Sequence, residues 1–376
     1  MPFRVAWRIL THQIGRTVLA SIGIFIAVLL VFVELGFFVA VPQGGMLVYD
    51  HMRFDLLLVS DTYVYQANSG TFPRARLDTV AKVAQVAQVS PIYFGAAKWQ
   101  DPNGGTRLDV SVLGIDPRAR DFAVSDIEEQ TATLEQRDTV LVDSTTRPLF
   151  GPLTPGRVVD IDGHRVTLAG SYVLGTGFLG LGVALASEAN FFRLFPLRPR
   201  DSVNLGLIEV KPGIALDAAE SAIKSALPAG MRVFTRDELS AHEVAYWTTR
   251  TATGLIFGSG LIVSIIVGVM VLYQTLATQI SRQLPQFATL KAIGYSDRYL
   301  DAIVLIESLL MMLVAFVPAM IAALGVYSLV RKQTLLPLDL TPSEFGIVFA
   351  ASLAMASVSA VLSLSALRRA DPAEVF

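Results

Sequence analysis

Four long stretches of the sequence are almost free of charged residues, and they constrain the fold more than any other feature. A helix that crosses a lipid bilayer needs about 20 consecutive apolar residues. The stretches cover residues 17–41, 251–281, 302–330 and 345–367, and their only charged side chains are Glu34 and Glu307. The sequence therefore predicts an α-helical membrane protein with four transmembrane helices.

Residues 42–250 have the composition of an ordinary globular domain. Short apolar runs separated by turn residues predict strands, and three segments have a helical pattern. Asp162-Gly163, between two such runs, is typical of a β-hairpin turn. We expect a large α+β domain between the first and second transmembrane helices. The predicted strands are 54–59, 108–114, 139–142, 158–161, 165–168 and 207–210, and the predicted helices are 74–87, 187–195 and 217–227.

Residues 235–253 also look helical. They lead into the second apolar stretch with no turn residue between them. We expect one continuous helix there, which would join the α+β domain rigidly to the membrane.

Positive charge gathers on one side of the predicted spans, where Lys and Arg mark the cytoplasmic side. We expect both termini and residues 282–301 in the cytoplasm, and residues 42–250 and the short loop 331–344 on the other side, which in a bacterial inner membrane is the periplasm. Residues 1–16 predict an amphipathic helix on the inner membrane surface, and residues 368–376 a cytoplasmic tail. The marking residues are Arg4, Arg8, Arg16, Arg282, Lys291, Arg298, Arg368 and Arg369, and the apolar stripe before the first span is Phe3, Trp7, Leu10 and Ile14.

The sequence lacks the residues that most enzyme classes require. There is no cysteine and there are four histidines, and a net charge of −2 gives no basic surface for nucleic acid. Residues 175–180 match the spacing of a dinucleotide loop without a second βαβ unit, and residues 151–156 lack the Lys-Ser/Thr of a phosphate loop. His242-Glu243 has no second histidine for zinc. We expect no catalytic, cofactor or metal site on this chain.

Two carboxylates within predicted spans are candidates for function, because a charge in the bilayer is costly. Glu34 lies towards the outer side of its span and could face a cavity between helices. Glu307 is six residues from Asp301, so reaching the inner interface would also explain it. Small residues form faces on two spans, which predicts close helix packing within one chain or in a homodimer; these are Gly254, Gly258, Gly260, Ser264 and Gly268, and Ser352, Ala356 and Ala360.

The segment between the second and third spans carries the most specific pattern. Residues 277–300, which include Leu284-Pro-Gln-Phe-Ala-Thr-Leu-Lys-Ala-Ile-Gly-Tyr295, resemble the coupling loop of MacB/FtsX/LolC-type ABC transporter permeases, and residues 284–295 are most similar to the DevC branch. The ending Leu367-Arg-Arg-Ala-Asp-Pro-Ala-Glu-Val-Phe376 is similar to that superfamily's tail. Ala6-Trp-Arg8, Glu34-Leu-Gly-Phe37 and Phe72-Pro-Arg74 are similar to the same branch. One departure is Arg282-Gln-Leu-Pro-Gln286, where many members have glutamates.

In the coupling segment we expect a short helix that docks in a groove on another protein, although a plain surface helix is the alternative. Phe287, Leu290 and Ile293 share one stripe, with Gln286 and Lys291 beside it, and Gly294 is expected to end the helix.

The resemblance implies a permease subunit of an ABC exporter that transmits ATPase motion to the periplasmic domain and drives efflux of an amphiphile. It implies a separate ATPase subunit, which holds the ATP and Mg²⁺, and a second copy of this chain. It also implies a periplasmic adaptor and an outer-membrane TolC-like channel. Two alternatives stay open: an FtsX-like regulator of a cell-wall hydrolase, and a membrane-anchored periplasmic enzyme or receptor.

Overall fold

The computed structural model describes residues 2–12, 14–175, 180–334 and 336–369. The chain divides into two compact units. The membrane unit comprises residues 1–41 and 251–376, and the α+β unit comprises residues 42–250. The four candidate membrane spans in the described residues, and the α+β unit between the first and second of them, confirm the predicted fold class.

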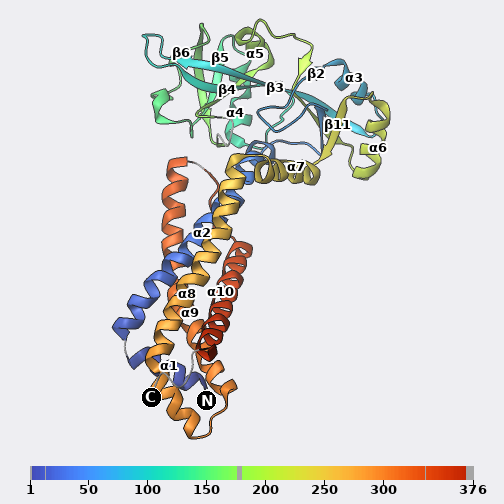
Figure 1. The fold of residues 1–376 in the computed structure, drawn as a ribbon. Coiled ribbons are helices and arrows are strands. Elements are labelled where there is room, and N and C mark those ends of the chain that lie inside the picture. The colour runs from blue at the N-terminus through green and yellow to red at the C-terminus, as the bar shows by residue number, and fades with distance from the viewer. Residues whose placement is uncertain (1, 13, 176–179, 335, 370–376) are drawn as a thin grey trace. The chain divides into compact units, whose positions relative to one another are not determined.

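The membrane unit consists of long helices around a common apolar core (Figure 1). Each spanning helix is longer than the sequence predicts, because apolar character marks the bilayer segment and not the end of the backbone hydrogen bonding. The helices are α1 (Pro2–His12), α2 (Ile14–Asp50), α8 (Ala252–Ala292), α9 (Asp297–Thr334) and α10 (Pro342–Arg369). Thus α2 continues through Pro42, and α8 continues through Pro285 into the segment predicted as a separate loop and short helix.

The small-residue faces serve packing within the chain. A Cβ atom added to Gly268 of α8 would lie 2.7 Å from Sδ of Met355 in α10, so the glycine lets these helices approach closely. The hydroxyl of Ser359 donates to the carbonyl of Val269 at 2.9 Å, and Ser308 of α9 donates to the carbonyl of Ala356 at 2.8 Å. Hydroxyls therefore bond across the helix contacts where no water competes.

The α+β unit is built on a nine-stranded sheet with the order β11-β1-β10-β3-β4-β8-β5-β7-β6. Alternate residues of β1 enter different cores: Leu56 and Leu58 face one cluster, and Leu57 and Val59 the other. The strands are β1 (Leu56–Ser60), β3 (Val86–Gln100), β4 (Leu108–Ile115), β5 (Thr139–Asp143), β6 (Val158–Ile161), β7 (His164–Tyr172), β8 (Val183–Ser187), β10 (Leu205–Val210) and β11 (Met231–Thr235), and β2 (Phe72–Pro73) pairs with β9 (Ser202–Val203) outside this sheet.

Helices supply residues to both cores, so the sheet is buried on both faces. Residues of α3 (Ala75–Ala81), α5 (Glu188–Leu194) and α6 (Leu216–Ala226) belong to the first core. Residues of α4 (Ser125–Leu134), α7 (Arg236–Thr249) and the last turns of α2 belong to the second. The predicted helix 74–87 is wrong in its second half, where β3 begins at Val86.

The Asp162-Gly163 prediction is confirmed. β6 pairs with β7 across this turn, and both residues have positive φ values, 50° and 83°. This backbone suits the twist of a two-residue hairpin, and glycine adopts it without steric cost.

The predicted continuous helix over 235–253 is wrong. α7 ends at Thr249 and α8 begins at Ala252, because Thr251 has extended backbone angles (φ −110°, ψ 150°). Its hydroxyl accepts a hydrogen bond from the amide of Gly254 at 3.1 Å, which caps the start of α8. In the sequence, Thr251 is the residue that indicates this break, because threonine commonly caps the start of a helix.

Gly268→Leu is expected to lower the stability of the membrane unit by about 1–3 kcal/mol, because the larger side chain overpacks the contact between α8 and α10. Gly325→Leu is the matched control, since nothing lies within 4 Å of a Cβ atom at that helical position. Thermal melting of both variants in detergent checks this. Equal melting temperatures for the two variants would show that the α8–α10 contact is not tight.

Candidate coupling segment, membrane cavity and buried carboxylates

The turn between α8 and α9 is tightly defined. The amide of Tyr295 donates to the carbonyl of Leu290 at 3.1 Å, and the amide of Gly294 donates to that of Lys291 at 3.0 Å. Together with the φ of +101° at Gly294, this is a Schellman ending, so the glycine ends the helix as predicted. The ammonium of Lys291 lies 2.8 Å from Oδ1 of Asp297, which joins the two sides of the turn.

The predicted docking stripe is divided between the interior and the surface. Phe287 is only 6% exposed and packs in the membrane unit's core, with Leu290 partly buried against the same core. Ile293 is 70% exposed, and Gln286, Lys291 and Gly294 are exposed as well. Tyr295, at 41% exposure, lies against Tyr299 with ring centroids 4.6 Å apart. The large apolar side chains that the tip exposes are therefore Ile293 and Tyr295, not Phe287.

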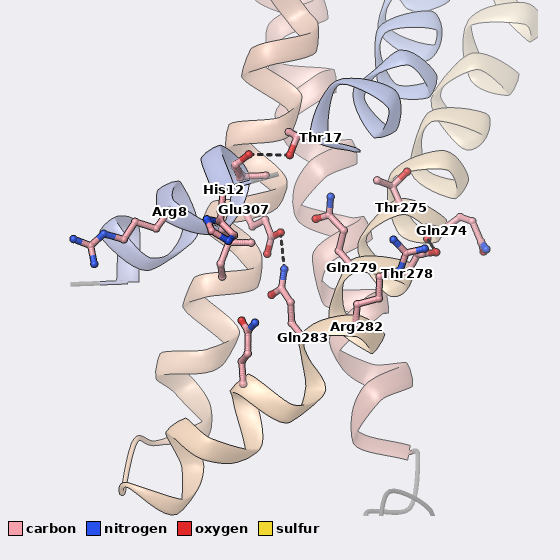
Figure 2. A pocket seen from close by; sticks show the side chains of 13 residues that line it. Arg8, His12, Thr17, Gln274, Thr275, Thr278, Gln279, Arg282, Gln283 and Glu307 are labelled. Carbon is pink, nitrogen blue, oxygen red and sulfur yellow. Dashed lines mark hydrogen bonds between the residues drawn. The ribbon is translucent and has the colours of Figure 1, made fainter. Parts of the chain in front are cut away.

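Glu307 does not reach the surface. Its side chain is fully buried in α9 and accepts a hydrogen bond from Nε2 of Gln283 at 3.3 Å. It lines a cavity of about 710 Å³, to which α1 and α8 also contribute (Figure 2). Glu307 is therefore buried beside this cavity and is not exposed at the protein surface.

Glu34 occupies a different place in the membrane unit. Its carboxylate lies over Gly260 of α8, where an added Cβ would be 2.4 Å from Oε2. That oxygen is buried and has no hydrogen-bond partner. The small residue at position 260 therefore makes room for the carboxylate, and Glu34 is not among the residues that line the cavity.

A buried polar cluster in the α+β unit was missed in the sequence. The hydroxyl of Tyr63 donates to Oε1 of Glu243 at 2.5 Å, and the indole N–H of Trp247 donates to Oε2 at 3.2 Å. The hydroxyls of Tyr49 and Tyr63 lie 2.8 Å apart. Only the i, i+4 spacing of Glu243 and Trp247 was visible in the sequence, because the tyrosines come from the end of α2 and from the loop after β1.

Arg236 stabilises the same region through hydrogen bonds to backbone carbonyls. Its guanidinium donates to the carbonyls of Phe54 at 3.0 Å, Tyr49 at 3.2 Å and Met52, and it lies over the ring of Phe54 at 4.0 Å from the centroid. The end of α2 and the start of α7 are therefore joined by a charged group and by the Glu243 cluster. Burial raises the pKa of Glu243 to about 7, although its hydrogen bonds from Tyr63 and Trp247 oppose the shift.

No group of three or more His, Asp or Glu side chains that could hold a metal occurs in the described parts of the chain. The glycine-rich match at 175–180 falls largely on residues 176–179, which lie outside the described residues.

Glu243→Gln is expected to reduce the pH dependence of stability. The folded protein holds the Glu243 proton up to about pH 7, whereas the unfolded chain releases it near 4.5. The contribution of Glu243 to the free energy of unfolding is therefore fully present below pH 4.5 and is lost as the pH rises from there through 7, by about 3 kcal/mol. The glutamine variant should lose that part of the slope.

The measurement is denaturation of the full chain in detergent between pH 5 and 8. Some slope will remain in the variant, because burial also raises the pKa of Asp121 to about 7. Glu129→Gln, at an exposed position of α4, is the control and should behave as the parent protein does. A Glu243→Gln slope equal to the parent slope would contradict a protonated Glu243.

Two family models match the chain. The MacB-like periplasmic core domain matches residues 17–226, and the FtsX-like permease C-terminal domain matches residues 258–372. A comparison with curated proteins gave no significant match.

Three solved structures that are similar to this chain come from MacB, from YknZ and from a putative permease. The periplasmic region of MacB from Actinobacillus actinomycetemcomitans is 9% identical over 50% of this chain and 92% of that chain, with a TM-score of 0.38. The extracellular domain of the noncanonic ABC-type transporter YknZ from Gram-positive bacteria is 14% identical over 48% and 99%, with a TM-score of 0.35. A domain of a putative permease from Porphyromonas gingivalis is 12% identical over 49% and 87%, with a TM-score of 0.34. With TM-scores below 0.5, these likenesses add no argument to the family match.

The MacB-like model alone covers more than half of the 376 residues, and the FtsX-like model covers most of α8 together with α9 and α10. The chain combines these two domains with four apolar helices long enough to span a membrane. It belongs to the MacB/FtsX-type ABC transporter permeases, which are inner-membrane proteins that work with a separate ATPase subunit.

Proposed function

We propose that the tip between α8 and α9 docks on the ATPase subunit and transmits its motion through the membrane. In this proposal the tip and both termini lie in the cytoplasm, and the α+β unit lies in the periplasm. ATP and Mg²⁺ are held by the ATPase alone, and this chain carries no cofactor.

The single observation that supports the proposal best is the shape of the tip. Ile293 and Tyr295 are exposed directly after the 41-residue helix α8, which ends in a defined turn. Pro285 lacks the N–H for one helix hydrogen bond and allows a bend near the tip, whereas the rest of α8 keeps its helical hydrogen bonds and moves as a body. A displacement at Ile293 would therefore be carried along α8.

The contact with the ATPase is expected to be mainly apolar. The exposed charges around the tip include Lys291 and Asp297, which already pair with one another. The segment 282–286 has one arginine and two glutamines where many family members have glutamates. We infer a groove on the ATPase that accepts Ile293 and Tyr295 and does not depend on a basic surface.

The outer partners follow from the family resemblance, closest to the DevC branch. We propose that two copies of the chain act together, with a periplasmic adaptor and an outer-membrane TolC-like channel, in the efflux of an amphiphile. Apolar side chains on α8 are exposed in the single chain, which is compatible with contact to lipid or to a second copy; they include Leu255, Ile256, Ile262, Val263 and Met270.

Ile293→Asp is expected to reduce stimulation of the partner's ATPase at least tenfold, because a carboxylate replaces the apolar group that enters the groove. Leu197→Asp, at a 98% exposed position of the α+β unit, is the matched control and should leave stimulation unchanged. ATP hydrolysis by the co-purified complex in nanodiscs measures both. The buried Phe287 is a poorer test position, since an aspartate there would disturb the membrane unit itself.

Normal stimulation with Ile293→Asp would refute docking through the tip. Co-purification of a cell-wall hydrolase, without an adaptor, would favour the FtsX-like regulator over the exporter. An isolated α+β unit with full activity would favour the membrane-anchored enzyme or receptor.

A further inference from the structure

The cavity beside Glu307 contains three buried oxygen atoms that lack hydrogen-bond donors. They are Oε1 of Gln279, Oε1 of Gln283 and Oε2 of Glu307. All three residues line the same cavity of about 710 Å³. A buried acceptor that has no donor destabilises the folded protein. Three such atoms in one cavity of the size that small ligands occupy indicate a ligand that brings several donors.

Two helices, α8 and α9, contribute these acceptors to the cavity. Gln279 and Gln283 are four residues apart and so lie on the same face of α8. In Figure 2, Gln283 points towards Glu307 on the neighbouring helix α9. Glu307 is 0% exposed and Gln283 is 9% exposed, so neither oxygen is satisfied by bulk solvent. A group with three N–H donors could satisfy these acceptors.

The helix α1 places the cavity at the depth of lipid headgroups. Ala6 and Leu10 are buried in the membrane unit, whereas Phe3 and Trp7 are 55% and 50% exposed. These two rings stack with centroids 6.3 Å apart. Exposed aromatic rings on a short amphipathic helix lie at the membrane interface. Arg8 and His12 of the same helix line the cavity, so it opens at that level.

The charges around the cavity have opposite signs at its centre and at its edges. The side chain of Glu307 is fully buried, and in Figure 2 the side chains of Arg8 and Arg282 extend to opposite sides of it. Guanidinium groups bind phosphate through paired hydrogen bonds. This arrangement fits a zwitterion with its amine inward and its phosphate at the edge.

We propose that this cavity binds the headgroup of a phospholipid with a primary ammonium, of which phosphatidylethanolamine is the common example. The ammonium donates to Gln279, Gln283 and Glu307, and the phosphate lies within reach of Arg8 or Arg282. A choline headgroup has no N–H donor and leaves the three acceptors unsatisfied. This site goes beyond the coupling role of the tip and does not depend on it.

Native mass spectrometry of the full chain tests the proposal. The protein is purified in detergent micelles doped with equal amounts of dioleoyl-phosphatidylethanolamine, dioleoyl-phosphatidylcholine or dioleoyl-phosphatidylglycerol. We expect at least tenfold more bound ethanolamine lipid than choline or glycerol lipid. Free phosphoethanolamine at equal concentration is included. Weaker binding than that of the ethanolamine lipid supports a lipid site, whereas equal binding would overturn it in favour of a soluble phosphoamine ligand.

Glu307→Gln replaces an acceptor oxygen with an amide nitrogen of the same size and should reduce ethanolamine-lipid binding to the choline level. Gln279→Met removes a second acceptor, keeps the helix and should weaken binding in the same direction. Ser352→Ala is the control, because Ser352 is also buried with an unpartnered hydroxyl but does not line the cavity.

Several results would overturn the proposal. Equal binding of the three lipids, or preference for the glycerol lipid, would exclude recognition of the ammonium. Selective binding that survives both Glu307→Gln and Gln279→Met would place the lipid elsewhere. A stability increase with Na⁺ or K⁺ and none with ethanolamine lipid would assign the three oxygens to a metal cation.

Discussion

The closed hydrogen bonding of the membrane helices is the constraint on which the rest of the structure depends. Within hydrocarbon no water replaces a lost backbone bond, so α8 must remain helical through the bilayer. That requirement leaves side chains as the only means of fitting the helices together. Gly260 makes room for a carboxylate, Gly268 makes room for Met355, and serine hydroxyls bond to the carbonyls of neighbouring helices. The unbroken helical backbone of α8 across the bilayer follows from this one condition.

Much of the fold could be predicted from local chemistry. The spans were visible because charge is excluded from them, and the hairpin at Asp162-Gly163 and the helix end at Gly294 were visible because positive φ favours such residues. The strand β3 was not, since Pro91 and Gly95 interrupt its apolar pattern and its stability comes from pairing with β10 and β4. The break at Thr251 was missed because helical composition continues on both sides of a single capping residue.

The candidate sites were predicted less well, since a helical stripe does not reveal which side the chain itself covers. Phe287 and Ile293 looked equivalent, yet one packs in the core and the other is exposed. Glu307 was recognised as costly, but its cavity depends on α1, which is almost 300 residues away in the sequence. The cluster around Glu243 joins residues 49, 63 and 243, and no spacing in the sequence connects them.

The strand β3 has a mechanical consequence for the α+β unit. Its 15 residues bond to β10 over residues 86–92, to β4 over residues 93–99, and to β6 at Trp99 and Gln100. The two halves of the sheet therefore share one covalent backbone instead of meeting at a loop. A force applied along this strand is borne by peptide bonds, while the neighbouring ladders share it in shear. The unit should thus tilt or translate as one stiff plate, and a change of shape would have to come from its edges.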